Sequence, residues 1–575
     1  MSDEDEVPDL RLRSPLDRFA AWIGPPRGYQ LTRWLVLRLL GLIYVFAFIG
    51  LIYQGPPLLG SHGLTPVVPY LARLREGSMG FWEAPSVLWF GASDGAMAAW
   101  SWIGLGLSIA VLLGYANLPI LFGLWAIYGS FVRVGQLWFS FGWEIQILET
   151  TLLAALLAHP WDPRPLRAPS PPGASLVLMR WLVFRIMLGA GLIKLRGDAC
   201  WKDLTCLNAH FETQPIPNPL SAWFHHLPDA VHAIGVGLNH VVELVLPWFV
   251  FGPRRLRLIA GIGMAVFQII LIASGNLAFL NWLTLVPILA LFDDDFLLRL
   301  IPRRPRAWLV GRLAAPAERD LRQLVIAFGL ALVALLVASP MPGELQLVLA
   351  LTSVPTAIVL ALRYRTHLVS PGKRLDLHVL LVGAIAAVIA IESVPVIANL
   401  ASSHQAMNRS YDRFDLVNTY GAFGSVGMVR NELVIEGTRD ADPATATWKA
   451  YELPCKPGDL ARRPCILGPY HRRLDWLIWF AAMNDQPRDP WVIHLVYKLL
   501  DGDKTIRELF AVDPFEGAMP TYIRIRRFVY HLAPWSADGW WTRDSEELWL
   551  PPVALDTPGL IDALQEHGWP SPSVH

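Results

Sequence analysis

Hydrophobic runs recur along the first 400 residues and are separated by short polar stretches. A helix needs about 20 mainly apolar residues to cross the hydrocarbon core of a bilayer. Two of the runs are short, and a third is interrupted by Pro355. The pattern predicts a membrane all-α polytopic bundle of about eleven spans. The predicted spans are residues 34–53, 96–115, 118–138, 142–158, 175–195, 234–252, 256–275, 277–292, 323–339, 345–362 and 376–398.

Arg and Lys are divided unevenly between the alternate loops. Cytosolic loops of membrane proteins carry an excess of these residues. One set of loops holds only Arg73, Arg75, Arg196 and Lys202. The bias predicts a cytosolic N terminus, and an odd number of spans then predicts an extracytoplasmic C terminus. The basic residues of the other set are Arg11, Arg13, Arg18, Arg27, Arg33, Arg164, Arg167, Arg180, Arg254, Arg255, Arg257, the run from Arg299 to Arg322, Arg363, Arg365, Lys373 and Arg374.

From residue 401 the apolar runs shorten, and polar residues and turn signals increase. LVNTYGAFGSV, MVRNELVIEG and TYIRIRRFVYHL favour strands, whereas RLDWLIWFAAMN and DPWVIHLVYKLLDG resemble amphipathic helices. We therefore expect a C-terminal extracytoplasmic α+β domain at 401–575. It follows a cytosolic segment at 1–33 and a transmembrane domain at 34–400, which includes an extracytoplasmic loop at 196–233.

The composition agrees with a membrane protein. Hydrophobic residues make up 54% of the chain and charged residues 17%, and the mean hydropathy is +0.39. Soluble domains carry about 25% charged residues. The formal net charge is zero, so no nucleic-acid partner is predicted. Membrane lipids are the first expected partners, and the oligomeric state is not predicted.

All four cysteines lie in segments expected on the extracytoplasmic side, where disulfides persist. Four cysteines allow three connectivities. Local pairing closes the shortest loops and predicts the disulfides Cys200–Cys206 and Cys455–Cys465. Free thiols and a redox-active first pair remain alternatives, whereas the lack of C-x2-C spacing argues against a zinc site.

Ionisable and amide side chains occur inside the predicted spans, where they usually face a protein interior or a wet cavity. They fit either a polar cavity open to the outside or a network of ion pairs that orders the helices. Lys194 also lies close enough to a helix end to extend to the membrane interface. The candidates are Arg133, Glu144, Glu149, Arg185, Lys194, His240, Glu243 and Gln268.

Apparent catalytic motifs lack the context that they need. GLGLSI and GIGMAV lie inside spans rather than between a strand and a helix. FGSVG has Phe423 where a nucleophile elbow requires glycine. His210 and Glu212 have no accompanying P-C-x-x-C sequence. No catalytic residue, metal or cofactor is predicted from these motifs.

The segment LIKLRGDACWKDLTCLNAHFETQPIPNPLSAWFHHLP closely resembles the lipase maturation factor family. FSFGWEIQILET, SGNLAFLNWLTLVPILALFDD, VNTYGAFGSV, VIEGTRD, KPGDLARRPC and PYHRRLDWLIWFAA repeat this resemblance in the same order. Members of the family are polytopic membrane proteins required for certain secreted lipases to fold and assemble.

The resemblance implies a maturation or folding factor, similar to a chaperone, for secreted lipase-like client proteins at the extracytoplasmic face. In the family this face is the lumen of the endoplasmic reticulum. Arg greatly outnumbers Lys here, which suggests a bacterial member in the cytoplasmic membrane.

A second, shorter resemblance begins at Gly191-Leu-Ile-Lys194-Leu195 and continues to Trp201. It is similar to a segment of vitamin K-dependent carboxylase relatives in which a lysine serves as a base. It implies the alternative of an integral-membrane enzyme that acts on a lipid-soluble cofactor or substrate, with Lys194 as the general base.

Overall fold

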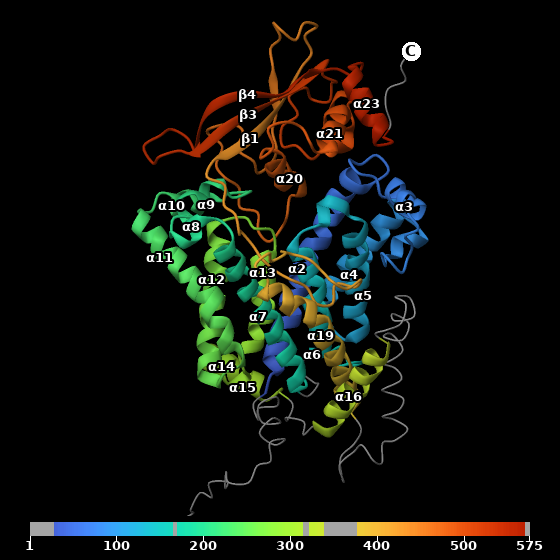
Figure 1. Cartoon of the computed structure of the whole chain (residues 1–575), viewed down its shortest axis with the longest axis vertical. Helices are drawn as coiled ribbons and strands as arrows, with labels where there is room; N and C mark the ends of the chain where they lie inside the picture. Colours follow the sequence, from blue (N-terminus) through green and yellow to red (C-terminus); the bar gives the residue numbers. More distant parts are fainter. Residues whose placement is uncertain (1–27, 165–169, 314–320, 339–375, 570–575) are drawn as a thin grey trace, which may run out of the picture.

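A helical bundle and a mixed C-terminal domain make up the chain in a computed structural model that describes residues 28–164, 170–313, 321–338 and 376–569 (Figure 1). The domain covers one end of the bundle. The main bundle helices are α2 (Gln30–Leu59), α4 (Asp94–Leu113), α5 (Leu118–Val134), α6 (Gly142–Leu157), α7 (Gly173–Arg196), α11 (Asp229–His240), α12 (Arg254–Ser274), α13 (Leu280–Ile288), α16 (Leu321–Ala338) and α19 (Leu377–Ala401).

Shorter helices lie at both ends of the bundle (Figure 1). Helices α3 (Val67–Glu76), α8 (Ala199–Lys202), α9 (Leu207–Thr213) and α10 (Pro219–His225) lie toward the C-terminal domain. Helices α14 (Asp294–Leu300) and α15 (Arg303–Val310) lie at the opposite end. A π turn, η3 (Val241–Val245), and a 3-10 helix, η4 (Leu246–Phe251), continue α11.

Among the described residues, six helical segments are long and apolar enough to cross a membrane. They are α2, α4, α7, the segment Asp229–Phe251, α12 and α19. The predicted span at 345–362 lies outside the described residues, and each of the other predicted spans overlaps a helix. The structure therefore supports a multi-span helical region with six candidate spans among the described residues, and it does not confirm the predicted count of about eleven.

Local sequence explains several helix boundaries. The Ser93 hydroxyl caps α4 by accepting from the Ala96 N–H at 3.2 Å, and Asn117 caps α5 through the Ile120 N–H at 3.1 Å. Such side chains satisfy donors that have no partner within the first helical turn. Gly114 ends α4 with φ of 113°, a left-handed conformation that favours glycine.

Small residues allow α2 and α4 to pack closely. A Cβ on Gly41 would lie 2.6 Å from the Leu112 backbone nitrogen, and one on Gly104 would collide with the Phe48 ring. Close approach through small residues is a common way for membrane helices to associate.

The C-terminal domain contains an antiparallel four-stranded sheet in the order β2–β1–β3–β4. Ile435 pairs with Ile525 in the β1–β3 register. The strands are β1 (Arg430–Thr438), β2 (Lys449–Tyr451), β3 (Tyr522–Leu532) and β4 (Trp541–Val553), and the helices are α20 (Arg473–Ala481), α21 (Pro490–Leu500), α22 (Lys504–Arg507) and α23 (Pro558–Glu566).

Two of the three predicted strand segments become β1 and β3, and both predicted helices form as α20 and α21. The strand predicted in LVNTYGAFGSV is wrong, because residues 417–426 form an irregular segment that packs on the bundle. Strand β4 was not predicted, since its charged and exposed positions give no clear alternation.

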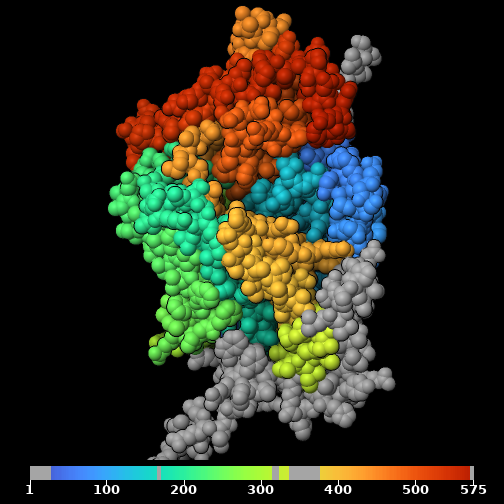
Figure 2. All heavy atoms as spheres, viewed as in Figure 1, coloured from blue at the N-terminus to red at the C-terminus, as the bar shows by residue number. Residues whose placement is uncertain are grey.

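One hydrophobic core continues from the bundle into the domain. Trp138 follows α5, and its ring lies 5.4 Å from that of Trp491 in α21. Figure 2 shows the orange and red domain seated directly on the end of the bundle, with α19 and the chain after it packed across this face. The bundle and domain therefore enclose a shared interior where they meet.

Candidate functional site

A cavity of about 660 Å³ lies where the bundle meets the C-terminal domain. Its walls come from α7, α11, α12, α13 and α20, together with parts of the segment 403–425. Its volume falls within the range of about 300–1,000 Å³ typical of ligand pockets. Its Phe, Tyr and Trp lining consists of Phe141, Trp143, Trp201, Phe211, Phe224, Phe267, Tyr420, Phe423, Trp476, Trp479 and Phe480.

Lys194 and Glu243 form a buried ion pair on the cavity wall. The Lys194 Nζ lies 2.7 and 2.8 Å from the two Glu243 carboxylate oxygens and 2.9 Å from Asn239 Oδ1. It also lies 5.0 Å from the centre of the Trp201 ring. The π turn η3 carries Glu243, and such turns occur often at functional sites. The ammonium is engaged by three acceptor atoms, which favours a structural ion pair over a general base.

Glu149 and Arg185 form a second buried pair, between α6 and α7. The segment 417–426 completes it. Arg185 donates to the Asn418 carbonyl at 2.7 Å, while the Tyr420 hydroxyl donates to Glu149 at 2.7 Å. The Asn418 N–H also donates to Glu149 at 3.0 Å. The polar groups of this segment therefore hydrogen-bond to the bundle instead of pairing with a strand of the sheet.

Glu144 and Arg133 also find partners outside the bundle helices. Arg473 of α20 contacts Glu144 at 2.8 Å, and Tyr128 donates a further hydrogen bond to Glu144. Arg133 lies 2.6 Å from Asp415. Burial raises the pKa of Asp415 to about 6, which opposes the effect of Arg133.

The remaining polar candidates make separate contacts. His240 Nε2 lies 3.0 Å from the Trp201 carbonyl. Asn281 donates to Gln268 Oε1 at 2.8 Å, and Gln268 Nε2 lies 3.8 Å from the Met187 sulfur.

The eight predicted intramembrane residues are therefore spread over several groups rather than one network. Glu149 pairs with Arg185, and Lys194 pairs with Glu243. Glu144 contacts Arg473, which lies outside the predicted spans. The partners missed in the sequence were Asp415, Asn418, Tyr420 and Arg473. No local pattern marks them, because each meets the bundle only after the chain has folded.

The aromatic helix α20 is mostly buried in the core. Trp476 and Ile478 are buried, whereas Phe480 is 42% exposed and lines the cavity. This helix brings Arg473 to the bundle and its aromatic side chains to the cavity wall.

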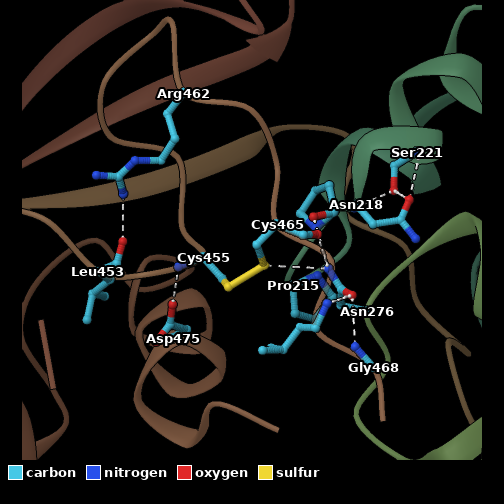
Figure 3. Close-up of a disulfide and its surroundings, with 12 residues drawn as sticks. Pro215, Asn218, Ser221, Asn276, Leu453, Cys455, Arg462, Cys465, Gly468 and Asp475 are labelled. Atoms are coloured by element: carbon cyan, nitrogen blue, oxygen red, sulfur yellow. Dashed lines mark hydrogen bonds between the residues drawn. A yellow bond between two sulfur atoms is a disulfide. The ribbon is translucent and has the colours of Figure 1, made fainter. Parts of the chain in front are cut away.

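The structure contains the disulfides Cys200–Cys206 and Cys455–Cys465, with Cα separations of 4.7 and 5.4 Å. Figure 3 shows how the second disulfide lies against the bundle. Asn276, after α12, donates to the Cys465 carbonyl at 2.9 Å and accepts from the Leu467 N–H at 2.9 Å. The disulfide thus stabilises a loop that docks on the bundle.

Asp475 supports the other side of this disulfide by accepting from the Cys455 N–H at 2.7 Å (Figure 3). Burial raises the pKa of Asp475 to about 6 despite this hydrogen bond. The pKa of nearby Lys456 falls to about 8, chiefly because the ammonium is buried. Within the described ranges, no cluster of three or more His, Cys, Asp or Glu residues could hold a metal ion.

Comparisons with known proteins cover both parts of the chain. Residues 31–299 match a family model described as "Lipase maturation factor transmembrane domain", and residues 416–551 match "Lipase maturation factor C-terminal domain". No solved structure matches significantly.

Full-length relatives extend this similarity. Lipase maturation factor 1 of Mus musculus is 40% identical over 564 residues, covering 95% of this chain and 90% of the relative. The Homo sapiens protein of that name is 38% identical, with coverage of 95% and 91%. Lipase maturation factor 2 of Xenopus laevis is 32% identical over 594 residues, with coverage of 92% and 83%.

Proposed function

Because this chain belongs to the lipase maturation factor family, we propose that it is a membrane-embedded maturation factor for lipases. The observation that carries the proposal is similarity along almost the whole chain, in both the transmembrane and the C-terminal regions. The same similarity and the apolar helices make it a multi-pass membrane protein.

The proposed client is a secreted lipase-like protein that meets this chain on the extracytoplasmic side. The C-terminal domain and the loop at 196–233 offer surfaces outside the apolar helices. Both carry a disulfide, which fits an oxidising compartment. That compartment is the endoplasmic reticulum lumen in a eukaryotic cell or the space outside the cytoplasmic membrane in a bacterium.

The proposed topology has about eleven spans, a cytosolic N terminus and an extracytoplasmic C terminus. Its parts are the N-terminal segment 1–33, the transmembrane domain 34–400 and the C-terminal domain 401–575. The Arg distribution in alternate loops supports this arrangement.

The buried ion pairs are proposed to hold the client-facing domain in a defined position. Arg473 joins α20 to Glu144 of α6, and Tyr420 joins the segment after α19 to Glu149. Rigid mounting on the bundle favours binding because less conformational freedom is lost when a client docks. A maturation factor also fits Lys194 better than an enzyme, since its ammonium is held by Glu243 and Asn239.

Deletion of the gene tests this function. We expect loss of active secreted lipase while its transcript and the secretion of unrelated proteins remain unchanged. Expression of the full chain in the deletion strain should restore the specific activity of the secreted lipase. An unchanged set of active secreted hydrolases in the deletion strain would contradict the proposal.

A further inference from the structure

The lining of the cavity extends to the apolar outer surface of the bundle. Three of its lining residues are also exposed there: Val231 and Leu238 on α11 are 44% and 58% exposed, and Ile270 on α12 is 46% exposed. Helices with such apolar surfaces face lipid in a membrane protein. The gap between α11 and α12 is therefore the side from which a molecule in the hydrocarbon phase would enter the cavity.

A polar pair lies inside this otherwise apolar cavity. Asn281 is 5% exposed and Gln268 is 4% exposed. Asn281 donates to Gln268 at 2.8 Å, but Asn281 Oδ1 has no hydrogen-bond partner among the described residues. Among the described residues, Gln268 Nε2 donates only to the Met187 sulfur at 3.8 Å, a weak acceptor.

Both residues line the cavity, and together they have one strong acceptor without a partner and one weakly used donor. If the oxygen and nitrogen positions of both amides are exchanged, Gln268 donates to Asn281 instead. The pair still has one acceptor and one donor available. A buried polar atom without a partner is unfavourable. A hydroxyl group satisfies both atoms, because it donates to one amide and accepts from the other.

The charges on the cavity wall are already compensated. Lys194 is paired with Glu243, and Arg196 donates to the Gln405 side chain and the Leu400 carbonyl. Burial lowers the pKa of His210 to about 4, so this ring is neutral near pH 7. A charged head group would find no unpaired opposite charge among these residues.

We propose that this cavity binds one neutral lipid that carries a hydroxyl group, of the monoacylglycerol or long-chain alcohol class. The lipid passes between α11 and α12, its chain contacts the aromatic walls, and its hydroxyl bonds to Asn281 and Gln268. This site is independent of whether the protein matures lipases.

Photo-crosslinking of the purified full chain in phosphatidylcholine nanodiscs tests the site. The probe is a monoacylglycerol with a diazirine in its acyl chain and a terminal alkyne. We expect saturable labelling within 267–284 and 476–480, suppressed by unlabelled mono-olein. Additional phosphatidylcholine or oleate should compete weakly.

Asn281→Leu keeps a similar volume and removes the acceptor. It should weaken competition by mono-olein about tenfold, as expected for a lost buried hydrogen bond. Asn431→Leu makes the same change on β1, away from the cavity, and should retain normal competition. Leu238→Trp should reduce labelling by narrowing the opening, and size-exclusion profiles verify that each variant is folded.

Several results would overturn the proposal. Labelling confined to exposed positions of α11 and α12 would show only surface lipid. Equal competition by phosphatidylcholine, or a folded Asn281→Leu variant with normal competition, would exclude the assigned head group. Loss of labelling on addition of a lipase, with no effect of mono-olein, would assign the cavity to a protein client.

Discussion

At the scale of single residues, the buried Lys194–Glu243 pair offers a direct test of a structural role. Lys194→Met leaves the Glu243 carboxylate uncompensated and should destabilise the protein by about 3–5 kcal/mol. Lys194→Arg should be milder because the positive charge remains. Thermal unfolding in detergent, followed by size exclusion, measures these changes.

The double variant Lys194→Met with Glu243→Leu should recover most of the stability, since neither charge is then left buried alone. Arg164→Met is the matched control, because Arg164 pairs with Asp162 at an exposed site. Exposed pairs contribute about 0–1 kcal/mol. Equal melting temperatures for Lys194→Met and wild type would show that the pair contributes nothing to stability.

The raised pKa of Asp475 predicts that the stability of the folded protein depends on pH. Its pKa is about 6 in the folded protein and 3.8 when unperturbed. The folded state therefore binds more protons between these values, and its stability falls as the pH rises from 4 to 7. The contribution is about 3 kcal/mol at 1.36 kcal/mol per pKa unit.

Asp475→Asn should remove this contribution, so wild type should lose stability relative to the variant over that pH range. Chemical unfolding at pH 4, 5, 6 and 7 measures the difference. The exposed Asp538 provides the control substitution Asp538→Asn, which should follow wild type. Parallel curves for wild type and Asp475→Asn would contradict the prediction.

At the scale of elements, the Cys455–Cys465 loop packs against the turn after α12 and holds the C-terminal domain on the bundle. Asn276→Leu removes hydrogen bonds to Cys465 and Leu467 and should loosen the C-terminal domain. We expect cleavage by trypsin within residues 456–473 to increase several-fold at unchanged protein concentration. Asn431→Leu, on β1, should leave the cleavage rate unchanged.

The two disulfides should survive that variant, because their loops close locally. Closure of short loops contributes about 2–4 kcal/mol in the chain-entropy model. Non-reducing peptide mapping should recover Cys200 linked to Cys206 and Cys455 linked to Cys465. Free thiols at all four positions, or a Cys200–Cys455 link, would refute this pairing.

At the scale of the whole molecule, the membrane topology decides which compartment the C-terminal domain and the disulfides face. Reporter fusions after residues 20, 170 and 310 should give cytosolic signals, and a fusion after residue 420 should give an extracytoplasmic signal. The reason is the Arg excess in one set of loops. A cytosolic signal at residue 420 would contradict the proposed topology and remove the compartment argument for the disulfides.

The sequence by itself determined features that depend on nearby residues. Apolar runs predict helices because each span satisfies its backbone hydrogen bonds internally. The alternation of MVRNELVIEG predicted β1, and the short spacing of Cys455 and Cys465 predicted their pairing. Family motifs were recognisable because each is a contiguous stretch.

Only the tertiary structure decided which distant groups meet. Glu144 and Arg473 are 329 positions apart, and nothing local indicates their contact. Residues 417–426 have strand-like sequence, yet Asn418 and Tyr420 hydrogen-bond to the buried Glu149–Arg185 pair, and the segment does not join the sheet. The cavity likewise exists only where α7, α11, α12, α13 and α20 converge, because no single helix can enclose a volume.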